Sequence, residues 1–371
     1  MKKSILQFSV IAAIAATMTL TTSCSSDDDA FVPTPIQLGV DLGKMTVTRG
    51  LTRAQSIATA TAGTTIDGEW KADHRLGIWT TDADGTSKIK VYKVNANATT
   101  TAALVTDAAV GTADADKVFY WKQKGEAKVI KAISHGILAD ADITARGNAT
   151  TIAPLTFTVS SDQTTDFNNE FLYGVGTIKH DNSATGGTKT IPMQHQLTLI
   201  EVTVKTKKNP SDLALTIGKT GSEIKLSGTF HEPDYTVQSS QDLQSNKYGY
   251  WENLTTDGVV TPRCSAIPVA DTPSGYKTTF SAVVIPQDFN SKSMFCIHYD
   301  GADYVYTGQA ADKLDEMPDA EDADSSNGIN GVGKKLAYTV KITDQEIDVT
   351  SATISAWTDA EGSYGGNAEL Q

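Results

Sequence analysis

Apolar and polar residues alternate along much of the chain, and this period of two predicts β-strands. The clearest early stretch has apolar residues at every second position: Ile36, Leu38, Val40 and Leu42. Successive side chains of a strand point to opposite faces, so these four should share one face. The first predicted element is therefore a strand with one apolar face.

Shorter runs with strand character recur, separated by turns that contain Gly, Asp and Asn. In the first half they are 76–79, 88–94, 118–121, 129–133 and 155–159. In the second half they are 214–217, 224–230, 277–285 and 294–299. A long strand is expected over 191–204, with a kink near Pro192. Convincing helical periods are rare, so the pattern predicts an all-β chain.

The alternation is also clear near the C-terminus. Its apolar positions are Leu336, Tyr338, Val340, Ile342, Ile347, Val349, Ile354 and Trp357. The preceding segment 312–333 is acidic and rich in Gly and Asn, which predicts a solvated loop. The length fits two domains, with the boundary expected near residue 190: 36–189 and 190–371.

The N-terminus has the features of an export signal. Lys2 and Lys3 precede an apolar run, 5–20, that is too short to span a bilayer comfortably. The run leads to Ser23-Cys24, a small residue before a cysteine, and then to the polar segment 25–29. This order predicts a lipoprotein signal peptide over 1–23, lipid on Cys24 and a flexible tether over 24–35. The alternative is an ordinary signal peptide with a chance cysteine.

Charge and cysteine content narrow the class of protein. The chain has 31 basic and 44 acidic residues, a net charge of −13. Loss of 1–23 removes two lysines and no acid, giving −15. Such an acidic protein is not expected to bind nucleic acid, which requires a basic face. Cys264 and Cys296 could form a disulfide in an exported protein, or could be small core residues.

No catalytic or metal-binding motif is present in the sequence. GxSxG, HExxH and GxxxxGK[ST] are all absent, and the six histidines lack metal-ligand spacing. The acids of 319–324 are interpreted as a solvated charge run rather than a glycosidase pair or a calcium loop. His195, and the aromatic group at 248–251, are interpreted as packed side chains. We therefore expect no enzyme activity and no cofactor.

Several short motifs resemble one known family in their order and spacing. They are the lipobox with its acidic tether, 51–54 (LTRA), 75–79 (RLGIW), 119–121 (FYW), 169–174 (NEFLYG), 193–198 (MQHQLT), 284–287 (VIPQ) and 352–357 (ATISAW). Each motif is weak alone, but together they cover nearly the whole mature chain. The chain thereby resembles the fimbrillin family, lipoprotein-exported subunits of type V pili in Gram-negative anaerobes.

The resemblance implies two β-sandwich domains with transthyretin-like topology. It also implies that an arginine-specific protease removes the first strand, 36–48 here, and that an extended segment of a neighbouring subunit fills the groove. Arg49 and Arg53 follow that strand in a polar, Gly-containing stretch that a protease could reach, and Arg53 fits the family pattern better. Burial of four apolar side chains stabilises by roughly 6–12 kcal/mol before ordering costs, so the vacated groove should attract a new strand.

The resemblance places the donor strand at the C-terminus, within 336–357, although these residues could instead be internal strands of their own domain. The expected function is a stalk or accessory subunit of a cell-surface pilus that supports adhesion. Its partners would be other pilus subunits, the outer membrane through lipid, and the protease. The alternative is a permanently anchored surface lipoprotein that binds a glycan or a host ligand.

Overall fold

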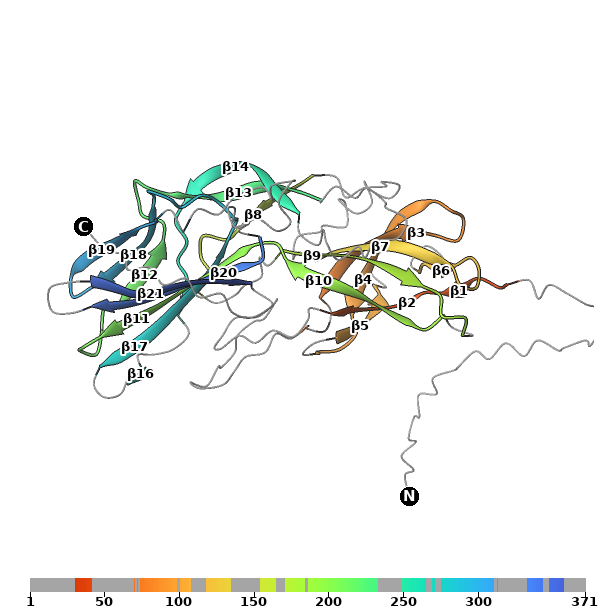
Figure 1. Ribbon diagram of the computed structural model, residues 1–371, viewed down its shortest axis with the longest axis horizontal. Helices are drawn as coiled ribbons and strands as arrows, with labels where there is room; N and C mark the ends of the chain where they lie inside the picture. The colour runs from red at the N-terminus through yellow and green to blue at the C-terminus, as the bar shows by residue number, and fades with distance from the viewer. Residues whose placement is uncertain are drawn as a thin grey trace, which may run out of the picture. The chain divides into compact units, whose positions relative to one another are not determined.

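The computed structural model describes residues 31–41, 70, 72, 74–98, 101–107, 118–134, 154–164, 171–183, 186–232, 249–264, 269–270, 275–309, 312, 332–342 and 347–356. The regular elements in these ranges are all β-strands, which confirms the all-β prediction (Figure 1). The described residues from Val32 onward belong to one compact unit.

Seven strands of the first part close into a barrel in the order β10-β2-β5-β4-β3-β7-β9. Their bounds are β2 (Gln37–Asp41), β3 (Arg75–Thr81), β4 (Ser87–Val94), β5 (Thr101–Thr106), β7 (Ala127–Ser134), β9 (Leu172–Lys179) and β10 (Thr188–His195). A short ladder joins β1 (Thr34–Pro35) to β6 (Tyr120–Trp121). Apolar and polar residues alternate along these strands, so that the apolar side chains point into the barrel core.

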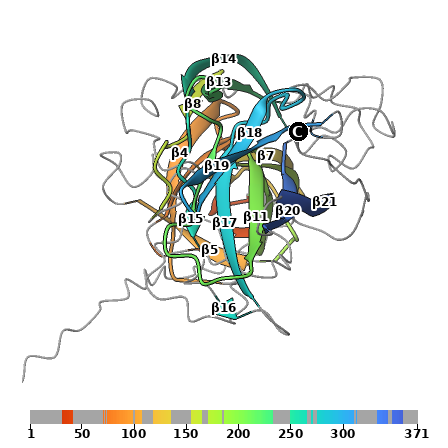
Figure 2. The ribbon, with the colours of Figure 1, turned by 90° about the vertical axis from the view of Figure 1, so that its left-hand side faces the viewer.

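A larger sheet of the second part has the order β15-β17-β11-β20-β21, with β16 also paired to β17; Figure 2 shows β17, β11, β20 and β21 side by side. The bounds are β11 (Thr198–Thr206), β15 (Arg263–Cys264), β16 (Val269–Ala270), β17 (Tyr276–Val284), β20 (Lys334–Ile342) and β21 (Ile347–Ala356). The long central strands carry Val, Ile, Leu and Phe at alternate positions, which suits a half-buried sheet.

Two three-stranded sheets complete the described structure. One contains β12 (Ala214–Ile217), β18 (Ser293–Tyr299) and β19 (Ala302–Thr307). The other contains β8 (Leu155–Thr158), β13 (Ile224–His231) and β14 (Tyr250–Gly258). Their apolar side chains share a core with those of the larger sheet. For example, the Tyr338 ring of β20 lies 5.4 Å from the rings of both Phe295 and Tyr306, so the sheets pack face to face.

The segment 191–204, which was expected to form one long strand, is divided between two strands, β10 and β11. The strand β10 is uninterrupted through Pro192, which pairs with Asp41 at the last position of the β10–β2 ladder. The break lies at Gln196 and Leu197, where the chain leaves the barrel as β10 and enters the larger sheet as β11.

The domain boundary near residue 190 stays a prediction. The change of sheet at Gln196 lies close to it. However, β8 precedes residue 190 and pairs with β13, which follows it. The sheet of β8, β13 and β14 therefore contains strands from both sides of the expected boundary.

Candidate functional site

The first predicted strand occupies an internal position of the barrel. β2 pairs in parallel with β10 over five positions and antiparallel with β5 over three. Ile36 and Leu38 are 3% exposed and Val40 is fully buried, as the alternation predicts. β2 also lies tightly against β5, because a Cβ on Gly39 would be 3.0 Å from the Ala102 carbonyl oxygen. Without β2 the barrel would be open between β10 and β5.

The start of this strand is held by the segment that contains β6. Thr34 pairs with Trp121, and Pro35 pairs with Tyr120. The Ile36 N–H donates a hydrogen bond of 2.7 Å to the carbonyl oxygen of Phe119. Residues 118–121 therefore fix the point at which the chain enters β2.

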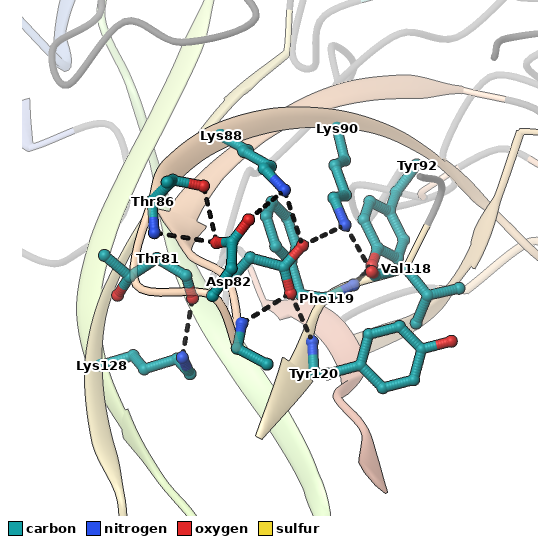
Figure 3. Close-up of polar contacts among 12 residues, drawn as sticks. Thr81, Asp82, Thr86, Lys88, Lys90, Tyr92, Val118, Phe119, Tyr120 and Lys128 are labelled. Atoms are coloured by element: carbon teal, nitrogen blue, oxygen red, sulfur yellow. Dashed lines mark hydrogen bonds and ion pairs between the residues drawn. The ribbon is translucent and has the colours of Figure 1, made fainter. Parts of the chain in front are cut away.

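A buried ion pair forms hydrogen bonds with the backbone of this segment (Figure 3). The Lys90 ammonium lies 2.7 Å from the Asp82 carboxylate, and both side chains are less than 10% exposed. Lys90 also donates to the Val118 carbonyl oxygen and lies 4.7 Å from the centre of the Phe119 ring. The Tyr120 N–H donates to Asp82 Oδ1 at 3.2 Å. One ion pair thus binds two backbone groups of the segment that holds β2.

Two further contacts complete the network. The Phe119 N–H donates to the Tyr92 hydroxyl at 3.2 Å, and the two rings stack. Lys88 lies at the edge of the network, 2.8 Å from the exposed Asp84 and 3.7 Å from Asp82. Its side chain is 32% exposed, so solvent screens this outer pair far more than it screens Lys90 and Asp82.

The network makes the protein sensitive to acid. Burial raises the pKa of the Asp82 carboxyl, but its hydrogen bond to Lys90 and the nearby positive charge hold the pKa below the ordinary 3.8. Ionised Asp82 therefore stabilises the fold above pH 3.8, and this contribution is lost as the pH falls through the lowered pKa.

We expect the free energy of unfolding to fall less steeply below pH 3.8 in Asp82→Asn than in the wild type, although Asp82→Asn is less stable at neutral pH. Urea titrations across this pH range measure the difference. An equal acid slope in both proteins would contradict the assignment.

The C-terminal strands occupy two different positions in their sheet. β20 is internal, parallel to β11 and antiparallel to β21, whereas β21 lies at the edge of the described sheet. The predicted apolar positions Leu336, Tyr338, Val340, Ile342 and Val349 are at most 3% exposed. Ile347 pairs with Ile342, and Ile354 pairs with Leu336, through the backbone. These residues thus form a hairpin within their own sheet.

Polar contacts fix β20 to its neighbours. Lys335 Nζ lies 3.0 Å from a carboxylate oxygen of Glu201 on β11. Burial raises the pKa of Glu201 even though the Lys335 charge acts in the opposite direction. The hydroxyl groups of Tyr338 and Tyr306 both donate to Asp312. Because that carboxylate is 3% exposed, the prediction that the solvated loop begins at residue 312 is wrong at this position.

Part of the predicted site lies outside the described residues. These positions are Cys24, Leu42, Arg49, Arg53 and Trp357, together with the acids of 319–324. Cys264 on β15 and Cys296 on β18 belong to different sheets, and no disulfide joins them. Among the described residues, no group of three or more His, Cys, Asp or Glu could hold a metal ion. The described part of the chain contains no helix suited to crossing a bilayer.

The Asp82–Lys90 pair was missed by sequence reasoning. Lys88 and Lys90 alternate with Ile89 and Val91, a pattern that normally places lysines on the solvent face. Lys90 is nevertheless 4% exposed, because residues 118–121 cover it. No local signal in the sequence predicts that cover.

The fold and these contacts define a class of protein: an all-β chain in which β2, near the N-terminus, completes a closed barrel and is held at its start by a segment bonded to a buried ion pair. The model of the fimbrillin-like family matches residues 52–357. The chain therefore belongs to the fimbrillin-like family.

Several solved structures are similar to this chain at low sequence identity. A structure from Bacteroides ovatus ATCC 8483, described as a candidate cell adhesion protein, is 14% identical, with a TM-score of 0.50 and coverage of 89% of this chain and 100% of that one. The fimbrial anchor protein Mfa2 of Porphyromonas gingivalis is 10% identical, with a TM-score of 0.35 and coverage of 87% and 98%.

The tip fimbrial protein Mfa3 of the same organism, with a C-terminal truncation, is 10% identical, with a TM-score of 0.40 and coverage of 87% and 99%. The comparison with curated protein sequences finds no match. The likeness to the Bacteroides ovatus structure shows a shared fold.

Proposed function

We propose that this protein is a structural subunit, of the stalk or accessory kind, of a cell-surface fimbrium that supports adhesion. It is exported as a lipoprotein anchored to the outer membrane through Cys24. An arginine-specific protease then cuts after Arg49 or Arg53, and the subunits polymerise by donor-strand exchange. Membership of the fimbrillin-like family supports the fimbrial role.

The observation that carries the proposal is the position of β2. It is bonded on both edges, and three apolar side chains are buried there: Leu38 and Val40 on the strand, and Ile36 just before it. Burial of these three stabilises by roughly 5–9 kcal/mol before ordering costs. Loss of the strand exposes an apolar slot and two unpaired strand edges, of β10 and β5. A strand from another subunit repairs both defects at once.

The cleavage proposal rests on the order of segments along the chain. Arg49 and Arg53 lie between β2 and Trp70, the first described residue that follows. A cut after either arginine breaks the covalent connection between β2 and the rest of the barrel. Only the noncovalent contacts of residues 34–41 then retain the strand, and a competing donor can replace it.

For the donor we propose β21 rather than β20. Release of β21 breaks one strand ladder, whereas release of β20 breaks two and disrupts the contacts of Lys335 and Tyr338. The donor must run parallel to β10 and antiparallel to β5, as β2 does. The slot lies in the barrel and the donor in another sheet, so each contact is head-to-tail and the product is a filament.

A truncation tests the donor. Removal of residues 343–371 should leave a subunit that accepts a donor strand but offers none. We expect the truncated subunit, once cut after Arg53, to stay monomeric and to cap filaments of full-length subunits when the two are mixed. Electron microscopy and gels of unheated samples measure filament length. Normal filaments from truncated subunits alone would contradict donation by β21, and binding of a peptide of residues 347–356 would show that the truncated subunit is folded.

A further inference from the structure

One continuous backbone connects the slot to the strand that leads into the proposed donor. From Thr188 to Thr206 the chain forms β10, which pairs with β2, and then β11, which pairs with β20. Both pairings are parallel, over five and eight positions respectively. A strand in the slot and β20 therefore run in the same direction along this backbone.

Gln196 lies at the break between the two halves of this backbone and is fully buried. Its N–H donates to the Phe171 carbonyl oxygen at 2.9 Å, and its own carbonyl oxygen accepts from Trp251 Nε1 at 2.8 Å. The side-chain Oε1 accepts from the Gly249 N–H at 3.0 Å, and Nε2 donates to the Gln194 carbonyl oxygen at 3.1 Å. Three of these hydrogen bonds fix the break to the starts of β9 and β14, and the fourth ties the side chain to the end of β10.

The surroundings of Gln196 are close-packed. The Trp251 ring lies 5.3 Å from the Phe171 ring and 5.4 Å from the Phe230 ring. A Cβ on Gly249 would lie 2.3 Å from the His231 carbonyl oxygen, so the backbone that bonds to Gln196 requires glycine. The break therefore cannot change its conformation without disturbing several buried groups.

We propose that Gln196 is a mechanical clasp that keeps this break closed when the protein is under tension. The proposal rests on the proposed function, because a filament pulls the strand in the slot toward its N-terminal end and β20 toward its C-terminal end. Each parallel ladder is then loaded in shear, so that its hydrogen bonds share the load. At the break, by contrast, the hydrogen bonds would open one at a time. Without the hydrogen bonds of the Gln196 side chain, the break would be the first part of the backbone 188–206 to open.

Single-molecule force spectroscopy on the uncut chain tests the proposal. Azide-bearing amino acids at positions 32 and 341, where Val32 and Lys341 are exposed, provide the two pulling points. Pulling there loads β2 and β20 in the directions expected in a filament. In Gln196→Ala, which leaves the Gly249 N–H without its acceptor, we expect opening at constant force to become about 10- to 100-fold faster.

Gln163 provides a matched control. It is also fully buried, and its amide forms a reciprocal pair of hydrogen bonds with the Val283 backbone of β17, at 2.8 and 2.9 Å, but no hydrogen bond to the backbone of 188–206. Gln163→Ala should lower stability in urea yet leave the opening rate under force close to that of the wild type. An unchanged rate in Gln196→Ala, or an equal acceleration in both variants, would overturn the proposal.

The pulling result does not depend on cleavage or assembly, because the chain's own β2 fills the slot. If fimbrial subunits prove to retain Cys24, the proposed function fails while the force measurement still stands. If Gln196→Ala opens like the wild type, the clasp fails while donor-strand exchange remains intact.

Discussion

Replacement of Arg49 and Arg53 together by alanine is expected to leave the protein folded and to stop filament growth. Both arginines lie outside the described strands, so the barrel and the sheets keep their contacts. β2 stays covalently attached, and the slot remains filled from within the same chain. If spontaneous release of β2 costs about 5 kcal/mol, roughly one slot in 5,000 is open at any moment. We therefore expect filament yield to fall by at least about a hundredfold.

The controls for this variant separate cleavage from charge. Lys44→Ala removes a positive charge from the same stretch of sequence and should assemble normally. The single variants Arg49→Ala and Arg53→Ala show which site is cut, and Arg53→Ala is expected to have the larger effect. Filament yield is measured by electron microscopy of surface preparations. Normal filaments from the double variant would refute arginine-directed processing.

Lys90→Ala has the largest expected effect on stability. It leaves the buried carboxylate of Asp82 without its cation and removes the donor to the Val118 carbonyl oxygen. Removal of one partner of a buried ion pair costs about 3–5 kcal/mol. The Asp82–Lys90 pair supports residues 118–121, which hold β1 and the residue that leads into β2. The start of β2 should therefore also become accessible to protease. Urea unfolding and limited proteolysis measure the two effects.

Lys88→Ala is the matched control for Lys90→Ala. The residue lies two positions earlier on the same strand, but its side chain is 32% exposed. We expect a loss of at most about 1 kcal/mol. The double variant Asp82→Asn/Lys90→Met should recover much of the stability lost in Lys90→Ala, because no charge is then buried alone. A loss of the same size in Lys88→Ala and Lys90→Ala would show that the buried pair has no special role.

Local alternation predicts strands well but does not predict their partners. The strand at 214–217 was predicted with its observed bounds, and 224–230, 277–285 and 294–299 were confirmed within one residue at each end. These segments have clear apolar faces, so the pattern within each is sufficient. The pairing of β8 with β13 and the closure of the barrel depend on contacts far apart in the sequence, which no local pattern contains.

Two of the strands that were missed, β14 and β19, have local reasons. β14 has a register shift, with Asn253 and Thr256 at positive φ and few buried side chains, so its period of two is interrupted. In β19 most side chains are only partly buried, and the apolar contrast is weak. In the candidate site, the burial of Ile36, Leu38 and Val40 followed from alternation. The ion pair behind residues 118–121 did not, because its burial depends on a distant segment.

Donor-strand exchange is tested most directly by the mass of the N-terminal fragment of subunits isolated from assembled filaments. Cleavage after Arg49 or Arg53 predicts a chain that begins at Gly50 or Ala54, with β1 and β2 absent and the barrel completed by a neighbour. A chain that begins at lipidated Cys24 in those filaments would contradict it, because the slot would then still hold its own first strand.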